Sequence, residues 1–184
     1  DADIRTVMKT LFLSDFFKGA RGKRVKCPAE FIAGTIKLTG EFREIEPGLP
    51  TLDSASIVMG QKLMDPPTVE GWHTGKEWID GGTLTERINF ATARVGNPEM
   101  PGTRAIIDRL AGSGDPITPS ELVDGVLDLA GPIEVTEETR TALLQLAGLD
   151  GDLEFGSSSD RTKSEDRIAR MLALAVASRE YQFA

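Results

Sequence analysis

Cysteine and histidine are almost missing from this chain of 184 residues, which has one of each, Cys27 and His73. One cysteine cannot form an intrachain disulfide, and the pair cannot supply the four nitrogen and sulfur ligands of a structural zinc site. A nucleophile with a histidine base would have to use His73. A carboxylate-only calcium or magnesium site stays open, since there are 29 acidic residues. We assign no metal site, no cofactor and no catalytic residue.

Long apolar runs are also missing. The run Met171–Ala177 is far shorter than the ~20 residues that span a bilayer, so we expect no transmembrane segment. The first residues lack the basic stretch followed by an apolar one that is typical of a signal peptide. We therefore expect no signal peptide in this chain, which leaves open that it begins downstream of one.

The net charge of −8 is unevenly placed. Residues 113–160 have 11 acidic side chains and one basic side chain, Arg140, which leaves the remainder slightly positive. An acidic surface repels the phosphate backbone, so we expect no nucleic acid partner. The short basic run Arg21, Lys23, Arg24 and Lys26 is typical of a solvated loop.

Apolar residues recur at helical spacing, and no alternation typical of a strand persists for five residues. The fold class is therefore all-α, an irregular bundle of about seven or eight helices with a Gly/Pro/Trp-rich loop. We expect Asp1 or Asp3 to cap the first helix, and Thr83 with Glu86 to form a capping box for the helix after the loop. The expected helices are 4–16, 28–39, 51–64, 83–95, 103–111, 118–130, 136–147 and 162–178. We divide the chain into 1–112 and an acidic region, 113–184, packing on it as one domain overall.

Two segments echo one another, Met8–Phe17 and Met171–Phe183. In each, an apolar helix ends in serine, and aromatic residues follow within a few positions. Serine favours a helix end or a turn, and the aromatic residue folds back on a core.

The loop from Asp65 to Gly82 gathers glycines, prolines and both tryptophans. Two exposed indoles beside carboxylates would make a platform for a sugar or a peptide. Alternatively, the tryptophans are buried and the loop is a structural plug. We expect Arg87 and Asn89 to orient the loop by hydrogen bonds to its carbonyls or to Asp80. The candidate binding or interface residues are Asp65, Glu70, Trp72, His73, Trp78, Asp80 and Arg87.

Asp150, Asp152 and Glu154 alternate like calcium ligands at the start of an EF-hand loop. However, Phe155 stands at the position of the glycine and Arg161 at that of the bidentate glutamate. A flexible acidic loop is the better interpretation.

Several motifs carry a family resemblance. They are Lys26-Cys27-Pro28-Ala29-Glu30-Phe31, Met59-Gly60-Gln61, Asp65-Pro66-Pro67-Thr68-Val69-Glu70-Gly71-Trp72, Gly75 with Trp78, and Leu84, Arg87, Asn89 and Phe90. In this order they resemble the carboxy-terminal part of the bacterial domain of unknown function family 1800. The closing Ser178-Arg179-Glu180-Tyr181-Gln182 is similar to that family's terminal Ser-Pro-Glu-Phe-Gln, with arginine and tyrosine in place of proline and phenylalanine.

The resemblance implies context rather than a reaction, because the family is uncharacterised. It implies an exported bacterial protein, periplasmic or at the cell surface, often encoded beside a sulfatase-like partner. We therefore expect a non-catalytic interaction or scaffold module of an exported assembly. Its partner surfaces would be the loop from Asp65 to Gly82, which we call the Trp loop, and the acidic face formed by residues 113–160. Its partners would be other protein chains, such as a sulfatase-like protein or an amino-terminal part of its own. The alternative is a hydrolase or a carbohydrate-binding module that uses carboxylates beside the Trp loop.

Overall fold

The computed structural model describes residues 3–45, 47–112, 114–131 and 133–184. These residues form nine α-helices, two short 3₁₀ helices and three isolated β-bridges, and they include no strand. The prediction of an all-α fold is therefore confirmed. Among the described helices, none combines the length and apolarity needed to cross a membrane. The helices are α1 (Ile4–Leu13), α2 (Asp15–Lys18), α3 (Pro28–Thr39), α4 (Leu49–Val58), α5 (Gly81–Val95), α6 (Pro101–Leu110), α7 (Pro119–Leu129), α8 (Glu137–Gly148) and α9 (Ser158–Ala177), with 3₁₀ turns η1 (Gly75–Trp78) and η2 (Glu180–Gln182).

Local capping chemistry explains most helix starts and stops. Thr118 caps α7 in a reciprocal capping box with Glu121, and Thr136 caps α8. Helix α3 begins with Pro28, which lacks the N–H that would be unsatisfied there. It ends at Gly40, whose φ of 71° is left-handed and costs glycine little.

Several expected boundaries were wrong for equally local reasons. The capping box of α5 is formed by Asp80 and Thr83, so this helix starts a turn earlier than Thr83 with Glu86 predicted. Ser14 divides the expected helix 4–16 into α1 and α2, because its extended backbone ends one helix and its hydroxyl caps the next. Of the two caps considered for α1, Asp3 accepts a hydrogen bond from the Arg5 amide, and Asp1 lies outside the described residues.

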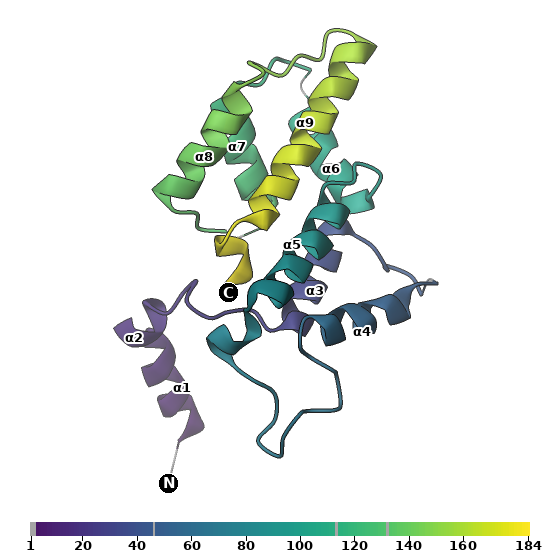
Figure 1. Cartoon of the computed structure of the whole chain (residues 1–184). Coiled ribbons are helices and arrows are strands. Elements are labelled where there is room, and N and C mark those ends of the chain that lie inside the picture. Colours follow the sequence, from purple (N-terminus) through teal and green to yellow (C-terminus); the bar gives the residue numbers. More distant parts are fainter. Residues whose placement is uncertain (1–2, 46, 113, 132) are drawn as a thin grey trace.

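Helix α9 lies at the centre of the packing (Figure 1). It packs most extensively on α5, and it also contacts α6, α7 and α8. Helix α3 packs on the other side of α5 and contacts α4 and α6. Most of the buried apolar side chains form one cluster, which includes Phe31 of α3, Phe90 of α5, Leu122 of α7 and Leu172 of α9. The boundary expected after residue 112 falls at residue 113, outside the described residues.

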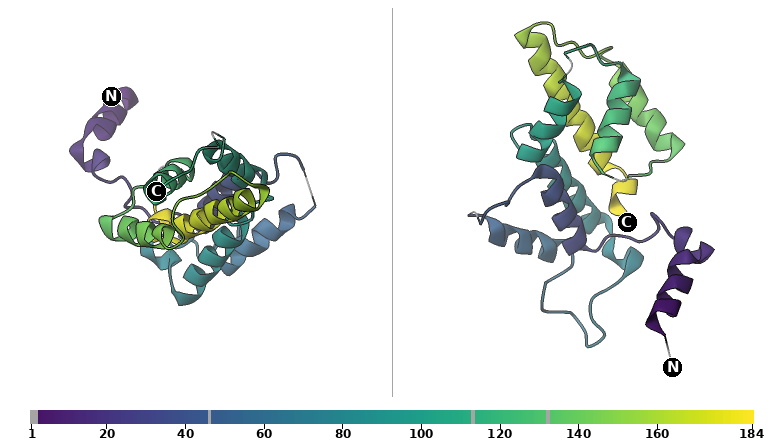
Figure 2. Two further views of the ribbon diagram at one scale, coloured as in Figure 1. Left: turned by 90° about the horizontal axis from the view of Figure 1, so that it is seen from above. Right: turned by 180° about the vertical axis from the view of Figure 1, so that it is seen from behind.

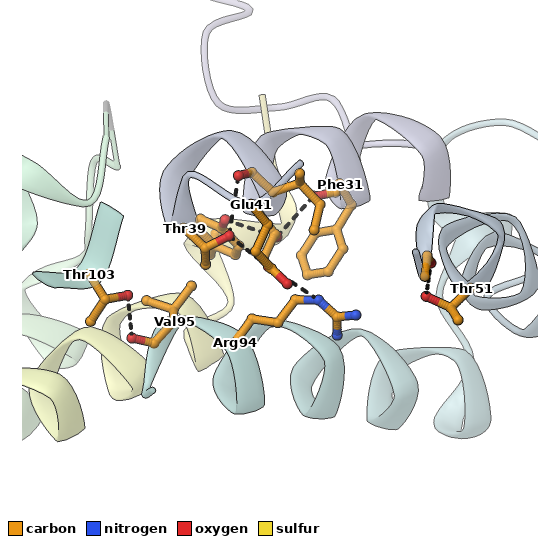
Figure 3. A network of polar contacts seen from close by, with 11 residues as sticks. Phe31, Thr39, Glu41, Thr51, Arg94, Val95 and Thr103 are labelled. Carbon is orange, nitrogen blue, oxygen red and sulfur yellow. Dashed lines mark hydrogen bonds and ion pairs between the residues drawn. The ribbon is translucent and has the colours of Figure 1, made fainter. Parts of the chain in front are cut away.

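Polar contacts hold the end of α3 against α5 and α6 (Figure 3). The Thr39 hydroxyl donates to Glu41 at 2.8 Å, and the Glu41 carboxylate lies 3.4 Å from Nε of Arg94 in α5. The Thr103 hydroxyl of α6 donates to the Val95 carbonyl at 3.1 Å, at the end of α5. These contacts fix the junction of three helices by hydrogen bonds as well as by apolar packing.

Helices α1 and α2 lie apart from this bundle in every view (Figures 1 and 2). Neither contains a buried residue, and within the described chain their main packing is on each other. We call Ile4–Lys18 the arm. It joins the bundle through the loop at residues 19–26.

Candidate interaction site

The Trp loop has one buried indole and one half-buried indole. Trp78 is only 5% exposed, so for this residue the alternative of a buried tryptophan in a structural plug holds, and not that of an exposed platform. Trp72 is half-buried, and its indole N–H donates to the Lys62 carbonyl at 3.0 Å. This bond ties the middle of the loop to the segment that follows α4. The tryptophans therefore anchor the loop and do not form a pair of stacking surfaces.

The polar candidates of this loop have separate local partners. Asp65 pairs with Lys62 at 2.5 Å, and His73 lies 3.4 Å from Glu77. Asp80 caps α5, and the Thr83 amide that donates to its carboxylate holds the pKa of Asp80 below its ordinary value. Glu70 is exposed. Within the described ranges no three His, Cys, Asp or Glu side chains gather as a metal site would require.

Arg87 is fully buried, and its partners lie elsewhere than expected. Its guanidinium donates to the Lys26 carbonyl at 2.7 Å and to Oε1 of Gln182 at 3.5 Å. It also lies 5.0 Å from the centre of the Phe31 ring, in a cation–π contact. Burial lowers the pKa of Arg87. The prediction that Arg87 orients the Trp loop is therefore wrong, and the exposed Asn89 has no hydrogen bond to that loop among the described contacts.

Arg87 instead supports a clasp between two distant segments, residues 24–26 and residues 182–184. Val25 and Phe183 form an antiparallel bridge. The Lys26 amide donates to the Gln182 carbonyl at 2.9 Å, and the Ala184 amide donates to the Arg24 carbonyl at 2.8 Å. The clasp fixes the point at which the arm leaves the bundle.

Tyr181 seals the inner side of this clasp. Its ring packs edge-on against Phe31 at 5.5 Å, and its hydroxyl lies 3.1 Å from Oγ1 of Thr35. Burial raises the pKa of Tyr181, so the phenol keeps its proton and remains a neutral hydrogen-bond partner of the threonine. The end of α9 and η2 is thus a packed docking unit on α3.

The acidic segment between α8 and α9, which contains Asp150, Asp152 and Glu154, borders an open hollow of about 390 Å³. Its main feature is Arg167 of α9, whose guanidinium donates to the carbonyls of Ala147, Gly151 and Asp152 at 2.7–3.1 Å. These bonds satisfy backbone oxygens at the end of α8, where a cation is favoured by the helix dipole. Arg167, the main polar group of the hollow, therefore serves to cap the end of α8.

The arm exposes apolar side chains that an amphipathic helix packed on a globular core would bury. The residues at helical spacing, Ile4, Val7, Met8, Leu11 and Phe12, are each 41–76% exposed, and Phe16 and Phe17 of α2 are exposed as well. An apolar stripe of this width is what surface helices of globular proteins turn toward a core. No such core covers it within the described chain.

The same pattern is buried in α9 and η2. When Ser14 is aligned with Ser178, the apolar residues of α1 fall on Ile168, Met171, Leu172, Ala175 and Val176, and Phe17 falls on Tyr181. Each of these α9 and η2 side chains is at most 5% exposed. Both serines have extended backbones, and both donate their amides to the carbonyl three residues earlier. The arm therefore has, in exposed form, the residue pattern that α9 and η2 bury on the bundle.

Comparison with known families agrees with the motifs. The model of the family described as "Protein of unknown function (DUF1800)" matches residues 1–183. The chain belongs to this family. No curated protein and no solved structure matches the chain. Membership of DUF1800 therefore assigns neither a reaction nor a partner.

Sequence reasoning missed the arm as the candidate site of this DUF1800 protein. Its periodicity indicated an amphipathic helix, but the same periodicity is found in α9, which is buried. The signal in the sequence was the similarity of the segments around Ser14 and Ser178. One of these segments is buried in the structure and the other is exposed.

Proposed function

We propose that this DUF1800 chain is a helical interaction module that docks onto another protein chain through the arm. The observation that carries the proposal is the exposure of the apolar face of α1 and α2 in a pattern whose counterpart in α9 is fully buried. Burying a large aliphatic or aromatic side chain is worth about 1.5–3 kcal/mol. A partner that covers this face therefore gains several such contributions.

The Trp loop and the end of α4 extend the apolar surface at the same end of the molecule. Val58, Leu63, Met64 and Val69 are all exposed, and Met64 and Val69 are almost completely so. The loop and the arm both lie at the end opposite α7 and α8 (Figures 1 and 2). This arrangement supports a partner surface at that end, whereas the buried Trp78 counts against a sugar platform.

The test is to isolate the tagged full chain from its native source and identify stoichiometric partners by intact mass. Leu11→Asp places a charge in the centre of the arm's apolar face, and Ile45→Asp is the matched control on an exposed aliphatic side chain outside the arm and the Trp loop. We expect the wild type and Ile45→Asp to retain the same partner, and Leu11→Asp to lose it.

Two outcomes would contradict the proposal. One is a set of partners that Leu11→Asp leaves unchanged. The other is binding of the wild type to anionic lipid vesicles that Leu11→Asp abolishes, because a basic amphipathic helix also suits a membrane surface.

The cellular setting is a separate proposal that rests on the family resemblance alone. We propose that the assembly is exported and that a sulfatase-like chain is among the partners. Fractionation of the native cells tests this directly. A chain confined to the cytosol would contradict export without affecting the role of the arm.

A further inference from the structure

Helices α8 and α9 form an apolar groove on the outside of the bundle. It has a volume of about 340 Å³, and Leu143, Leu146 and Leu174 line it together with small side chains. Leu146 and Leu174 are 45% and 39% exposed, although both are aliphatic. Glu138 and Thr139 lie at one end of the groove, near the start of α8.

The charge around this groove is opposite to that of the arm. The arm, Ile4–Lys18, has three basic side chains and one acidic side chain, and residues 113–160 have eleven acidic and one basic. Arg5 and Lys9, four residues apart, lie on one flank of the arm's apolar face. Glu137 and Glu138 stand in the first turn of α8. A basic apolar helix and an acidic apolar groove are complementary surfaces.

The arm leaves the bundle beside the groove. Arg21, three residues after α2, pairs with Glu134 at 3.1 Å. Glu134 lies just before Thr136 and Glu138, where the groove begins. Because the arm and the groove both begin near the Arg21–Glu134 pair, a two-fold axis at this point would place the arm of each copy near the groove of the other.

We propose that two copies of this chain exchange arms, each docking the apolar face of α1 and α2 into the α8–α9 groove of the other copy. This inference rests on the proposed function and names the partner. A single docked helix of ten residues falls below the ~1,200 Å² at which specific interfaces begin. Reciprocal exchange doubles the buried surface. It also gives a closed dimer, because both arms and both grooves are occupied and none is left free for a third copy.

The experiment is analytical ultracentrifugation of the full chain over a wide range of concentration and at two salt concentrations. We expect the wild type to approach twice the chain mass of 19.9 kDa, and to dissociate more readily at high salt because the complementary charges are screened. Leu11→Asp and Leu146→Asp should each sediment as monomers, and Ile45→Asp should behave as the wild type.

An equimolar mixture of the two monomeric variants gives the sharpest result. The intact arm of Leu146→Asp meets the intact groove of Leu11→Asp, while the other contact has both defects. We expect a heterodimer weaker than the wild-type dimer, and none from either variant alone. Leu174→Lys, on the opposite wall of the groove, replaces Leu146→Asp if circular dichroism shows that the latter has unfolded.

A wild type that stays monomeric overturns the inference, as does a dimer that survives both groove variants. If the monomer still captures a different chain through Leu11 in its native source, only the exchange is wrong and the proposed function stands. If that capture also fails, both are wrong.

Discussion

Gly102 at the start of α6 lies directly on the backbone of Leu38 at the end of α3. A Cβ atom at position 102 would stand 2.0 Å from the Leu38 carbonyl oxygen and 2.7 Å from the Thr39 carbonyl carbon. No side chain has room there, and the obstacle is backbone, which cannot rotate away.

Gly102→Ala should therefore lower the free energy of unfolding by roughly 1–3 kcal/mol, the usual range for overpacking. Gly34→Ala is the matched control, because Gly34 is an exposed helical glycine of α3 with open space around it. It should raise stability by about 0.5–1 kcal/mol through helix propensity. Urea unfolding monitored by circular dichroism measures both, and equal effects of the same sign would contradict the close crossing.

Arg87→Ala should destabilise the fold by roughly 2–4 kcal/mol, because it leaves the Lys26 carbonyl without its donor and removes a buried stem from the Phe31 ring. Arg87→Lys should recover little, since one ammonium cannot reproduce the planar fork. The exposed Arg109 provides a control, and Arg109→Ala should stay within about 0.5 kcal/mol of the wild type. A stable Arg87→Lys protein would show that charge alone is sufficient.

Substitution of the two tryptophans by alanine should lower the free energy of unfolding by clearly different amounts. Trp78→Ala removes a buried indole and should cost about 3–5 kcal/mol. Trp72→Ala removes a half-buried ring and one hydrogen bond, and should cost about 1 kcal/mol. Urea denaturation of the two variants checks the order, and a larger loss for Trp72 would contradict the assignment of Trp78 as the anchor.

The emission of the two indoles tests the carbohydrate alternative. Trp72→Phe should leave a blue-shifted emission from Trp78 that iodide quenches poorly. Trp78→Phe, where the chain folds, should leave a red-shifted emission from Trp72. Soluble glycans should quench neither. Saturable quenching of Trp72 by a glycan would instead favour a sugar-binding module.

Glu180 makes part of the stability depend on pH. Burial by itself would raise its pKa, but hydrogen bonds from the Thr136 amide and from the hydroxyls of Thr136 and Thr139 outweigh burial and hold the pKa below the ordinary value. A depressed pKa in the folded state stabilises the fold above the ordinary glutamate value of about 4.3, and this contribution is lost as the pH falls through the folded value.

Glu180→Gln should therefore lose roughly 1 kcal/mol at neutral pH and nothing at the acidic end, where the wild-type carboxyl is protonated too. Thermal unfolding of both proteins between neutral pH and pH ~3 measures the difference. Thr139→Val should give part of the same loss in the wild type and little more in the Glu180→Gln protein. Parallel curves for the wild type and Glu180→Gln would rule out this linkage.

The helices were predicted well from the sequence where the residues that begin and end a helix lie within one turn of its ends. Thr118 with Glu121, Thr136, Pro28 and Gly40 each act within one turn, so their effect can be read from neighbouring residues. The start of α5 was misplaced because both Asp80 and Thr83 suit a cap position, and only the folded loop decides between them.

The candidate site was harder to predict because burial is a long-range property. Arg87 looked like a loop-orienting residue from its place in the chain, yet its partner Gln182 is far away in sequence. The apolar face of α1 has the same periodicity as that of α9. Whether such a face meets a core or solvent depends on which other helices pack nearby, and spacing alone carries no information on that.

The central position of α9 has a consequence for biosynthesis. This helix supplies Ile168, Leu172 and Val176 to the core, but it follows α3, α5 and α7 in the chain. During synthesis those earlier helices emerge from the ribosome before the element that joins them, so their apolar faces are transiently uncovered. Compact folding of the bundle must therefore wait until α9 has been translated.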